Sequence, residues 1–307
     1  MKKERMMFTD SSSGVNIAKD PAVVWFQGKY RMYYSVTPDR KHPEAGWGIG
    51  IAQSDDRINW EILGKIRPEG ELESKGICAP GAMVYEGKIH IFYQTYGDFA
   101  KDAICHAWSE DGIHFTRNAT NPIVRAKGDW NNGRAIDADV ISFQGMLYLY
   151  FASRDPEGKI QFQVVSRCPM DGKFERDSWE QCCDQPVLRP EKPWEQECIE
   201  AAAALVHEDR VYLFYAGAYN NSPQQIGVAV SSDGIHFERI SEEPFLPCGL
   251  PGTWNSSESG HPYVFEDRDG KVYLFYQGNN DNGRSWYLSC VQIEFRNGIP
   301  VLVDEKI

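Results

Sequence analysis

One short pattern recurs five times along the chain, and it constrains the fold more than any other feature. A tight turn is followed by a run of aromatic and aliphatic residues, as in GKIHIFYQ and GKVYLFYQ. The five copies start at Gly28, Gly87, Gly145, Asp209 and Gly270, and the intervals between them are 59, 58, 64 and 61 residues. A nearly constant period indicates an architecture built from equivalent units.

Each copy belongs to a larger unit with the pattern of a four-stranded sheet. An apolar run such as AVVWF or GAMVYE precedes the copy across a short turn, which is typical of a β-hairpin. A third apolar segment follows and in two repeats leads into Ser-x-Asp-Gly-Ile-His-Phe. Asp-Gly supplies the positive φ of a tight turn before a fourth strand. No long amphipathic helix is indicated.

These units predict an all-β protein, a five-bladed β-propeller with about four antiparallel strands per blade, in which residues 1–307 form a single domain. The Ala-rich segment 201–204 has good helix propensity, but it occupies the position of an inner strand and is predicted as one, with a helix as the alternative. Repeats longer than the common period of about 40 to 50 residues place extra length in loops, and loops around a central funnel build a pocket.

The charge and composition of the chain argue against some classes of binding partner. The net charge is −12 and no run of Lys or Arg occurs, which disfavours a nucleic acid or an anionic membrane surface. No apolar stretch is long enough to span a membrane, and MKKERMMFTDSSSG lacks the apolar core of a signal peptide. We expect a cytoplasmic protein, or a periplasmic or secreted one if an export leader precedes this sequence. The eight cysteines form no CxxC pattern and are expected to be thiols.

Polar residues open four of the five inner strands. Counting back eight residues from the turn leads to Asp20, Ala79 and Asp137, and counting back nine leads to Glu200 and His261. The inner strands of a propeller surround one axis, so we expect three carboxylates and one imidazole to meet there. Taken singly, each residue also fits a structural role in a turn or on the surface.

Gathering carboxylates in a funnel is unfavourable, because like charges and burial raise their pKa values. Cleavage of a glycosidic bond gives a reason for it. One protonated carboxylic acid donates to the leaving oxygen, while an ionised carboxylate activates water or attacks the anomeric carbon. A third carboxylate can keep the pKa of the acid high. The group of residues therefore indicates a glycosidase.

The motifs that open the inner strands resemble those of glycoside hydrolase family 43, with five-bladed relatives in families 32, 62, 68 and 117. They are Lys19-Asp20-Pro21, Cys78-Ala79-Pro80, Ala135-Ile136-Asp137-Ala138, Ile199-Glu200-Ala201-Ala202 and Ser259-Gly260-His261-Pro262. The resemblance extends over residues 18–295. The fourth motif departs from the family's Glu-Gly-Pro because two alanines follow the glutamate, which leaves Glu197 as an alternative acid.

By this resemblance Asp20 is similar to the general base, Glu200 to the general acid, and Asp137 to the carboxylate that tunes the acid and orients the substrate. Asp139, two residues further along the strand, is an alternative for the tuning role. His261 is similar to a central histidine that reaches Ca²⁺ or water in the channel. One histidine would hold Ca²⁺ weakly, since this ion prefers oxygen ligands. No organic cofactor is expected.

The resemblance further implies an inverting enzyme for β-D-xylosides or α-L-arabinofuranosides, as in xylan degradation, and the long loops favour exo-action. Trp47 and Trp254 could stack on a sugar ring, as could Trp130 and Trp286. Arg134, Asn255 and Arg284 could donate hydrogen bonds to its hydroxyls. A carbohydrate is thus the expected partner.

Two other functions stay open. A propeller phosphorylase, such as a family 130 enzyme acting on β-mannosides, needs a cationic phosphate clamp beside the acid. A carbohydrate-binding propeller without catalysis needs no convergent carboxylates.

Overall fold

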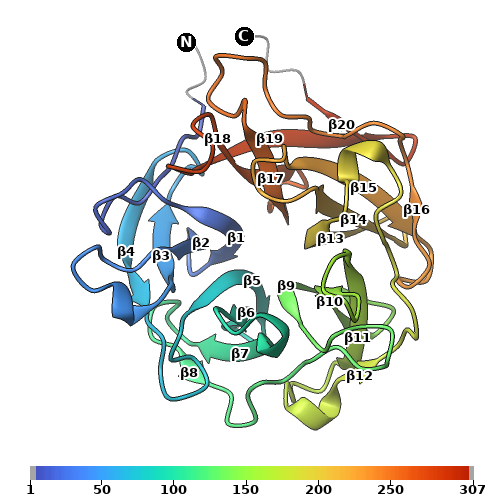
Figure 1. Ribbon diagram of the computed structural model, residues 1–307, viewed down its shortest axis with the longest axis horizontal. Helices are drawn as coiled ribbons and strands as arrows, with labels where there is room; N and C mark the ends of the chain where they lie inside the picture. The colour runs from blue at the N-terminus through green and yellow to red at the C-terminus, as the bar shows by residue number, and fades with distance from the viewer. Residues whose placement is uncertain (1–4, 304–307) are drawn as a thin grey trace.

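Within residues 5–303, which the computed structural model describes, twenty β-strands form five antiparallel sheets of four strands (Figure 1). The four strands of each sheet are consecutive in sequence. The first strand of every sheet lies nearest the common axis (Figure 1). This arrangement confirms the five-bladed propeller.

The strands of the five blades follow the sequence repeat. The first blade comprises β1 (Lys19–Phe26), β2 (Lys29–Val36), β3 (Gly48–Ser54) and β4 (Trp60–Ile66). The second comprises β5 (Ile77–Tyr85), β6 (Lys88–Thr95), β7 (Ile104–Ser109) and β8 (Thr116–Arg117). The third comprises β9 (Ile136–Phe143), β10 (Met146–Arg154), β11 (Gln161–Pro169) and β12 (Glu180–Gln181). The fourth comprises β13 (Ile199–His207), β14 (Arg210–Gly217), β15 (Gln225–Ser231) and β16 (Glu238–Arg239). The fifth comprises β17 (Glu258–Glu266), β18 (Val272–Asn279), β19 (Tyr287–Arg296) and β20 (Ile299–Leu302).

Helical structure in the described part of the chain is limited to short 3₁₀ turns in connections. They are η1 (Pro43–Ala45), η2 (Phe99–Lys101), η3 (Arg176–Ser178) and η4 (Pro193–Glu195). None of the helices found in residues 5–303 has the length and apolar character needed to cross a membrane. The Ala-rich segment 201–204 lies inside β13, so the strand prediction is confirmed and the helix alternative is wrong.

The turns expected from the sequence form as predicted. In the first hairpin both central residues, Gln27 and Gly28, have positive φ (46° and 80°), as a type I′ turn requires. In the Ser-x-Asp-Gly turn of the second blade, Ser109 Oγ donates to Asp111 Oδ1 over 2.9 Å. The same oxygen accepts the backbone N–H groups of the next turn residues, Ile113 and His114, at 2.8 Å each. The aspartate therefore fixes the turn between the third and fourth strands.

Residues before the first blade close the ring. Phe8 and Leu288 of β19 exchange two backbone hydrogen bonds of 2.9 and 2.8 Å. Further along, Trp286 N–H donates to the Asn16 carbonyl over 2.9 Å. The N-terminal segment thus lies along the fifth blade before it enters β1, which ties the last blade to the first.

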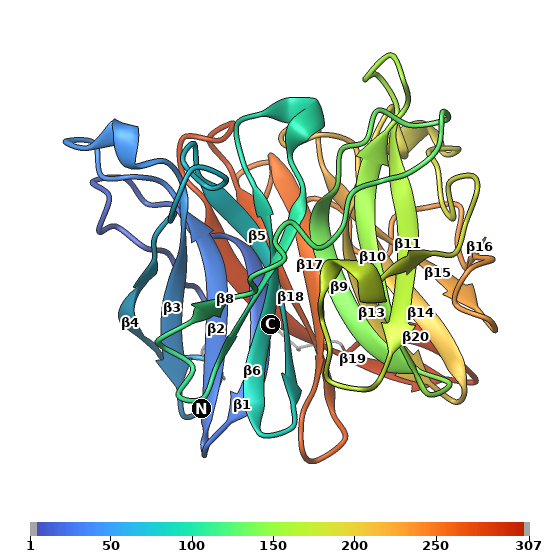
Figure 2. The same ribbon diagram turned by 90° about the horizontal axis from the view of Figure 1, so that it is seen from below.

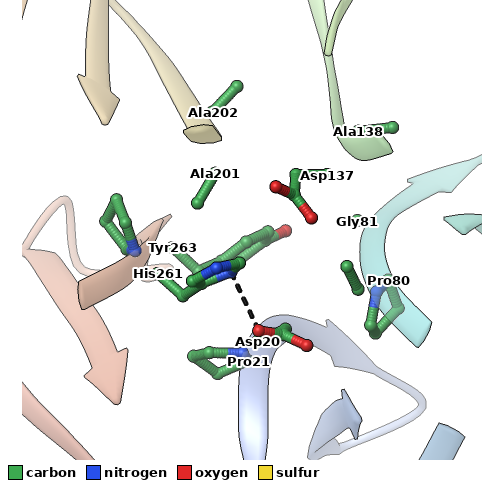
Figure 3. A pocket seen from close by; sticks show the side chains of 12 residues that line it. Asp20, Pro21, Pro80, Gly81, Asp137, Ala138, Ala201, Ala202, His261 and Tyr263 are labelled. Carbon is green, nitrogen blue, oxygen red and sulfur yellow. Dashed lines mark ion pairs between the residues drawn. The ribbon is translucent and has the colours of Figure 1, made fainter. Parts of the chain in front are cut away.

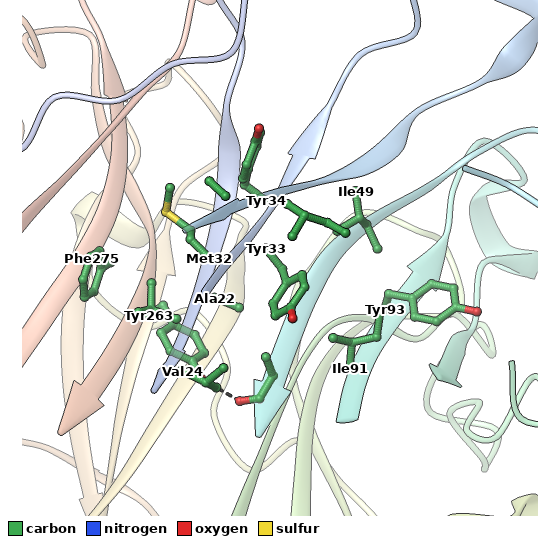
Figure 4. Packing of buried hydrophobic residues seen from close by; sticks show 14 of the residues in the cluster. Ala22, Val24, Met32, Tyr33, Tyr34, Ile49, Ile91, Tyr93, Tyr263 and Phe275 are labelled. Atoms are coloured by element: carbon green, nitrogen blue, oxygen red, sulfur yellow. Dashed lines mark hydrogen bonds between the residues drawn. The ribbon is translucent and has the colours of Figure 1, made fainter. Parts of the chain in front are cut away.

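Aromatic side chains fill the space between the blades. In the cluster that joins the first, second and fifth blades, Tyr33, Tyr34 and Tyr93 are fully buried (Figure 4). Each such ring removes roughly 150–250 Å² from water. Tyr263 of β17 packs in the same cluster and donates its hydroxyl hydrogen to the Ala82 carbonyl over 2.7 Å. Most of the chain's aromatic repeat signature is therefore core, which is the more common role for such residues.

The start of every inner strand contains a β-bulge, where the pairing register with the second strand shifts. Within each bulge one residue has positive φ; these residues are Asp20 (51°), Ala79 (47°), Asp137 (55°), Ala201 (55°) and His261 (42°). We call these five positions the axial positions. The bulge breaks the simple alternation of a strand and re-aims the side chain that it carries.

The structure corrects the predicted position of Glu200 by one residue. Glu200 pairs with Ala216 in the same way that Lys19 pairs with Ser35, so it corresponds to the residue before the axial position. The turn at Asp209 has the same length as the first hairpin turn, and the correct count is eight residues, which leads to Ala201.

All five axial positions lie at one end of the propeller, which we call the mouth face. The strands alternate in direction, so the connections from second to third strand and from one blade to the next also lie at this end (Figure 2). The blade-to-blade connections span residues 67–76, 118–135, 182–198 and 240–257. The opposite face carries the tight hairpin turns. The extra length of the repeats is thus concentrated around the mouth, as expected.

Candidate active site

An imidazole ring connects two carboxylates at the centre of the mouth face. His261 Nδ1 lies 2.8 Å from Asp20 Oδ1 (Figure 3). On the other side of the ring, His261 Nε2 lies 3.2 Å from Glu200 Oε1. The three residues come from the fifth, first and fourth blades, and each is only 7–8% exposed. Burial disfavours a charged ring, yet Asp20 and Glu200 outweigh it and raise the pKa of His261 well above its usual value. The ring is therefore an imidazolium that bridges two anions.

Asp20 is held in its ionised form. Burial opposes the charge, but His261 and Lys19 lie close enough to hold the pKa of Asp20 well below its usual range. A carboxylate that is ionised at neutral pH can accept a proton from water.

Glu200 is surrounded by hydrogen-bond donors. Gln224 Nε2 donates to Glu200 Oε1 over 2.7 Å, and Gln161 Nε2 donates to Glu200 Oε2. Both glutamines are fully buried. Burial raises the pKa of Glu200, but the hydrogen bonds from His261 and Gln224 outweigh it and lower the pKa to about 2. These donors therefore favour the ionised form of Glu200 in the substrate-free protein.

The pKa of Asp137 is shifted in the opposite direction to those of Asp20 and Glu200. Burial, together with repulsion from Glu200 and Asp20, raises the pKa of Asp137 to about 7, although His261 counteracts this. Its Oδ2 is buried and has no hydrogen-bond partner among the described residues. Of the three carboxylates, Asp137 is therefore the one that is most readily protonated near neutral pH.

A small pocket lies at this centre and receives residues from all five blades (Figure 3). It is lined by Asp20, Pro21, Ala79, Pro80, Gly81, Asp137, Ala138, Ala201, Ala202, His261, Pro262 and Tyr263. The structure thus brings together Asp20, Asp137 and His261 at the pocket, with Glu200 in contact with the imidazole. These four residues lie up to 241 positions apart in the sequence.

Three of these side chains could in principle hold a metal ion. Ligand atoms of Asp137, Glu200 and His261 all lie within 4.8 Å of one another. However, both nitrogens of His261 face carboxylates at hydrogen-bonding distance, so the ring has no nitrogen free for a cation. Ca²⁺ also prefers six to eight oxygen ligands. As arranged here, these residues do not fit a Ca²⁺ bound through His261.

Two arginines lie behind Glu200. Gln161 Oε1 accepts hydrogen bonds from Arg154 Nε at 2.7 Å and from Arg134 Nη1 at 3.4 Å. Arg134 also pairs with buried Asp102 at 3.5 Å. Because the guanidinium groups occupy the amide oxygen, the amide N–H of Gln161 is directed to Glu200. Arg134, a predicted substrate-binding residue, is therefore placed behind the carboxylates and reaches Glu200 through this glutamine.

The other predicted substrate-binding residues lie on mouth-face loops. Trp47 is half-buried, and its ring lies 5.7 Å from that of Tyr96. Arg284 is exposed in the β18–β19 connection. For these two, sugar binding stays a prediction.

Trp254 and Asn255 are engaged in packing. The Trp254 ring lies against Tyr276 with centroids 5.6 Å apart, and Asn255 Nδ2 donates to Ser259 Oγ over 2.8 Å. These contacts stabilise the loop before β17. Their predicted role toward substrate gains no support from this placement.

The structure also bears on the alternative residues for the acid and for the tuning carboxylate. Glu197 is exposed on the surface, whereas Glu200 is buried beside His261, so the geometry disfavours Glu197 as the acid. Asp139 Oδ2 accepts the backbone N–H of Ala204 over 2.7 Å and ties β9 to β13. The bulge at Asp137 explains the difference, because it breaks the alternation that would place Asp139 on the same side.

Sequence reasoning missed the donors that surround Glu200. Gln161 is the first residue of β11, and Gln224 directly precedes β15. Both therefore lie where a third strand starts at the mouth face. The third and fourth repeats each have a glutamine at this place, Gln161 in KIQFQVV and Gln224 in PQQIGVA. This shared residue was the sequence signal that could have identified the donors.

Known proteins resemble this chain in sequence. The sequence model of glycosyl hydrolases family 43 matches residues 15–300. A β-1,2-mannobiose phosphorylase from Thermoanaerobacter sp. (strain X514) is 31% identical over 119 residues, which cover 34% of this chain and 37% of that enzyme. A sucrose-6-phosphate hydrolase from Escherichia coli is 29% identical over 111 residues, which cover 32% of this chain and 22% of that protein. The chain thus spans well under half the length of the curated relatives it matches.

Solved structures share the whole fold. A thermostable family-43 glycoside hydrolase superposes with a TM-score of 0.77 at 22% identity, covering 97% of this chain and 96% of that one. An α-L-arabinofuranosidase from Lactobacillus brevis gives 0.71 at 18% identity, covering 92% and 94%. An endo-1,4-β-xylanase from Bacteroides thetaiotaomicron gives 0.70 at 21% identity, covering 94% of each chain. At these identities the likeness concerns the fold, but the family model covers nearly all of the sequence, and the chain belongs to glycosyl hydrolase family 43.

Proposed function

We propose that the protein is an inverting, exo-acting glycosidase for β-D-xylosides or α-L-arabinofuranosides. The observation that carries the proposal is the pair of opposite environments in one pocket. Asp20 lies against the His261 ring, which favours its ionised form, whereas Asp137 has a buried oxygen without a hydrogen-bond partner among the described residues and a raised pKa. Glycosidic bond cleavage needs both states of a carboxyl group at the same time.

In this proposal Asp20 is the general base. The imidazolium of His261 keeps it ionised and fixes its orientation. A water molecule on the face of the sugar opposite the leaving group gives its proton to Asp20 and attacks the anomeric carbon. The imidazole ring stands between Asp20 and Glu200. Inversion requires the base and the acid to lie about 6.5–9.5 Å apart, with room for water between them.

Glu200 and Asp137 together supply the proton to the leaving oxygen. In the free protein Asp137 is more readily protonated than Glu200, and Glu200 is the proposed donor, so a proton passes from Asp137 to Glu200 as the substrate binds. Repulsion between the two carboxylates favours this transfer, since one proton serves both. Asp137 is thus the proposed tuning residue.

The test uses Asp20→Asn and Glu200→Gln on two classes of substrate. We expect Asp20→Asn to lose activity on every glycoside by about 10²–10⁴-fold. Glu200→Gln should lose a similar factor on alkyl glycosides and retain far more on 4-nitrophenyl glycosides, whose leaving group needs no proton. Full activity of both variants, or a retained anomeric configuration of the product by NMR, would overturn the proposal.

Phosphorolysis is a second candidate, favoured by one observation. Arg134 and Arg154 place two guanidinium groups behind Glu200, and a phosphorylase is among the relatives. Both groups already bind Gln161, and an ionised Asp20 would repel a phosphate dianion, so we favour water as the nucleophile. A rate that depends on inorganic phosphate, with a sugar 1-phosphate as product, would favour phosphorolysis. Sugar binding without turnover would indicate a carbohydrate-binding propeller.

A further inference from the structure

The last residue of the repeated strand signature differs among the blades in a way that follows the axial positions. The five copies end in Ser35, Gln94, Ala152, Ala216 and Gln277. In the structure each of these residues lies on the second strand of its blade, opposite the residue before the axial position. They are therefore structurally equivalent and differ only in the side chain.

The two glutamines each reach the axial residue of the next blade. Gln94 Oε1 accepts the backbone N–H of Asp137 over 2.8 Å, and Gln277 Oε1 accepts the backbone N–H of Asp20 over 2.9 Å. Both glutamines are buried, with exposures of 2% and 0%. Ser35 Oγ accepts the backbone N–H of Ala79 over 2.7 Å in the same way. Three axial N–H groups are thus satisfied by the preceding blade, and the acceptor is a glutamine at the two positions that carry an aspartate. Alanine occurs where the next axial residue is Ala201 or His261.

These bonds act on a strained part of the backbone. Asp137 and Asp20 have φ values of 55° and 51°, which side-chain-bearing residues adopt only when their surroundings hold them there. The bulge removes the N–H from the strand ladder, and a buried N–H needs an acceptor. The glutamine side chain supplies that acceptor and so fixes the peptide from which the carboxylate projects.

A second contact fixes Gln277 itself. Its Nε2 donates to Glu258 Oε1 over 2.6 Å, and the fully buried Glu258 also accepts the Trp286 indole N–H over 3.2 Å. The amide therefore cannot rotate without breaking a bond to a carboxylate, and its oxygen remains directed to Asp20.

We propose that Gln94 and Gln277 are positioning residues, which hold the bulged peptides of Asp137 and Asp20 so that both carboxylates face the axis. This inference rests on the proposed glycosidase function. It adds a role for two residues that do not line the pocket and act only through the backbone of the next blade. Small displacements of a reacting group cost about 100-fold in rate, so the effect should appear in kcat.

The test compares Gln94→Met with Thr95→Val. Thr95 is the next residue of β6, is also buried, and accepts the backbone N–H of Ala103 over 3.0 Å, which is not an axial position. Both changes remove one acceptor for a buried N–H at similar side-chain volume. We expect similar losses of Tm. Gln94→Met should lower kcat by about 100-fold with little change in KM, and Thr95→Val should leave both near wild type.

A third variant, Gln94→Glu, keeps an acceptor oxygen and should recover part of the lost kcat. A crystal structure of Gln94→Met should show the Asp137 carboxylate displaced from His261 and Glu200. Unchanged kcat together with an unchanged Asp137 position would overturn the positioning role. If the wild-type protein hydrolyses no glycoside, the proposed function fails, and the position of Asp137 in that crystal structure still decides the role of Gln94.

Discussion

Two buried carboxylates, Glu195 and Asp137, show how differently one propeller treats the same chemical group. Glu195, in the loop before β13, is fully buried and accepts five hydrogen bonds. Two of them come from Arg239, at 2.7 and 2.8 Å, and one from the Tyr215 hydroxyl at 2.7 Å. Burial opposes its charge, but Arg239 and the backbone N–H groups lower the pKa of Glu195.

Asp137 is nearly as buried, but it has no arginine paired to its carboxylate and one oxygen without a hydrogen-bond partner among the described residues. The second blade repeats the satisfied arrangement, since Glu73 accepts from Tyr93 at 2.6 Å and from Arg117 at 3.0 Å. This difference in hydrogen-bond partners indicates that Glu195 stabilises the fold. Asp137 lowers the stability of the fold, as expected for a residue with a functional role.

The largest expected effect separates function from stability at Asp137. Asp137→Asn removes the proton-holding group, and we expect kcat/KM on aryl glycosides to fall by about 10²–10⁴-fold while Tm stays the same or rises. Steady-state kinetics and thermal unfolding of the same preparation measure both. Asp139→Asn is the matched control, because Asp139 is buried on the same strand and its carboxylate accepts backbone N–H groups of Ala204 and Val140. A large fall in Tm for Asp137→Asn would contradict the comparison.

The second-largest expected effect is a loss of stability on substitution of Glu195. Glu195→Ala leaves Arg239 without its main partner, and breaking a buried ion pair in this way costs about 3–5 kcal/mol of unfolding free energy. Urea unfolding measures it, and activity per folded molecule should remain near wild type. Glu242 provides the control, since its side chain is 81% exposed and pairs with Lys192 at 2.7 Å. Glu242→Ala should cost less than about 1 kcal/mol. Equal losses for the two variants would show that Glu195 adds nothing through burial.

The pH dependence of stability should differ between wild type and Asp137→Asn. The pKa of Asp137 is about 7 in the folded protein and near its usual value of 3.8 in the unfolded chain. Between these two values the folded state binds more protons, so this group lowers stability as pH rises from about 4 to 7. The Tm advantage of Asp137→Asn should therefore grow over that window and stay constant above it. An advantage that shrinks with rising pH would show that Asp137 is ionised in the folded protein.

The same comparison explains which features the sequence could predict. The propeller follows from a periodic apolar pattern, and local hairpin chemistry fixes its turns, so the blades were predictable from residues such as Gly28 and Asp111. The axial positions of Asp20 and Asp137 followed from a count of eight residues back from the turn, and that of His261 from a count of nine. These positions depend on strand length and turn length, which the sequence displays directly.

The surroundings of the carboxylates were harder to predict. Glu200 lies one residue before the axial position, because the turn at Asp209 has the same length as the first hairpin turn and calls for a count of eight residues rather than nine. The donors Gln161 and Gln224 reach it from strands whose ends meet only in three dimensions. The arginine that satisfies Glu195 lies 44 residues further along the chain, in the outermost strand of the same blade. No local pattern distinguishes such a satisfied glutamate from an unsatisfied aspartate.

The smallest expected effect is that of metal removal. It tests which group supplies the positive charge that offsets the buried carboxylates in each region. At Glu195 the charge that offsets burial comes from Arg239, and at Asp20 and Glu200 it comes from the His261 imidazolium. If protein groups supply the charge in both regions, dialysis against EDTA should change neither Tm nor kcat/KM. Both are measured before and after Ca²⁺ is added back. Losses that Ca²⁺ restores would show that a cation, rather than the imidazolium, neutralises the axial carboxylates, because His261 would then have to release at least one carboxylate to bind it.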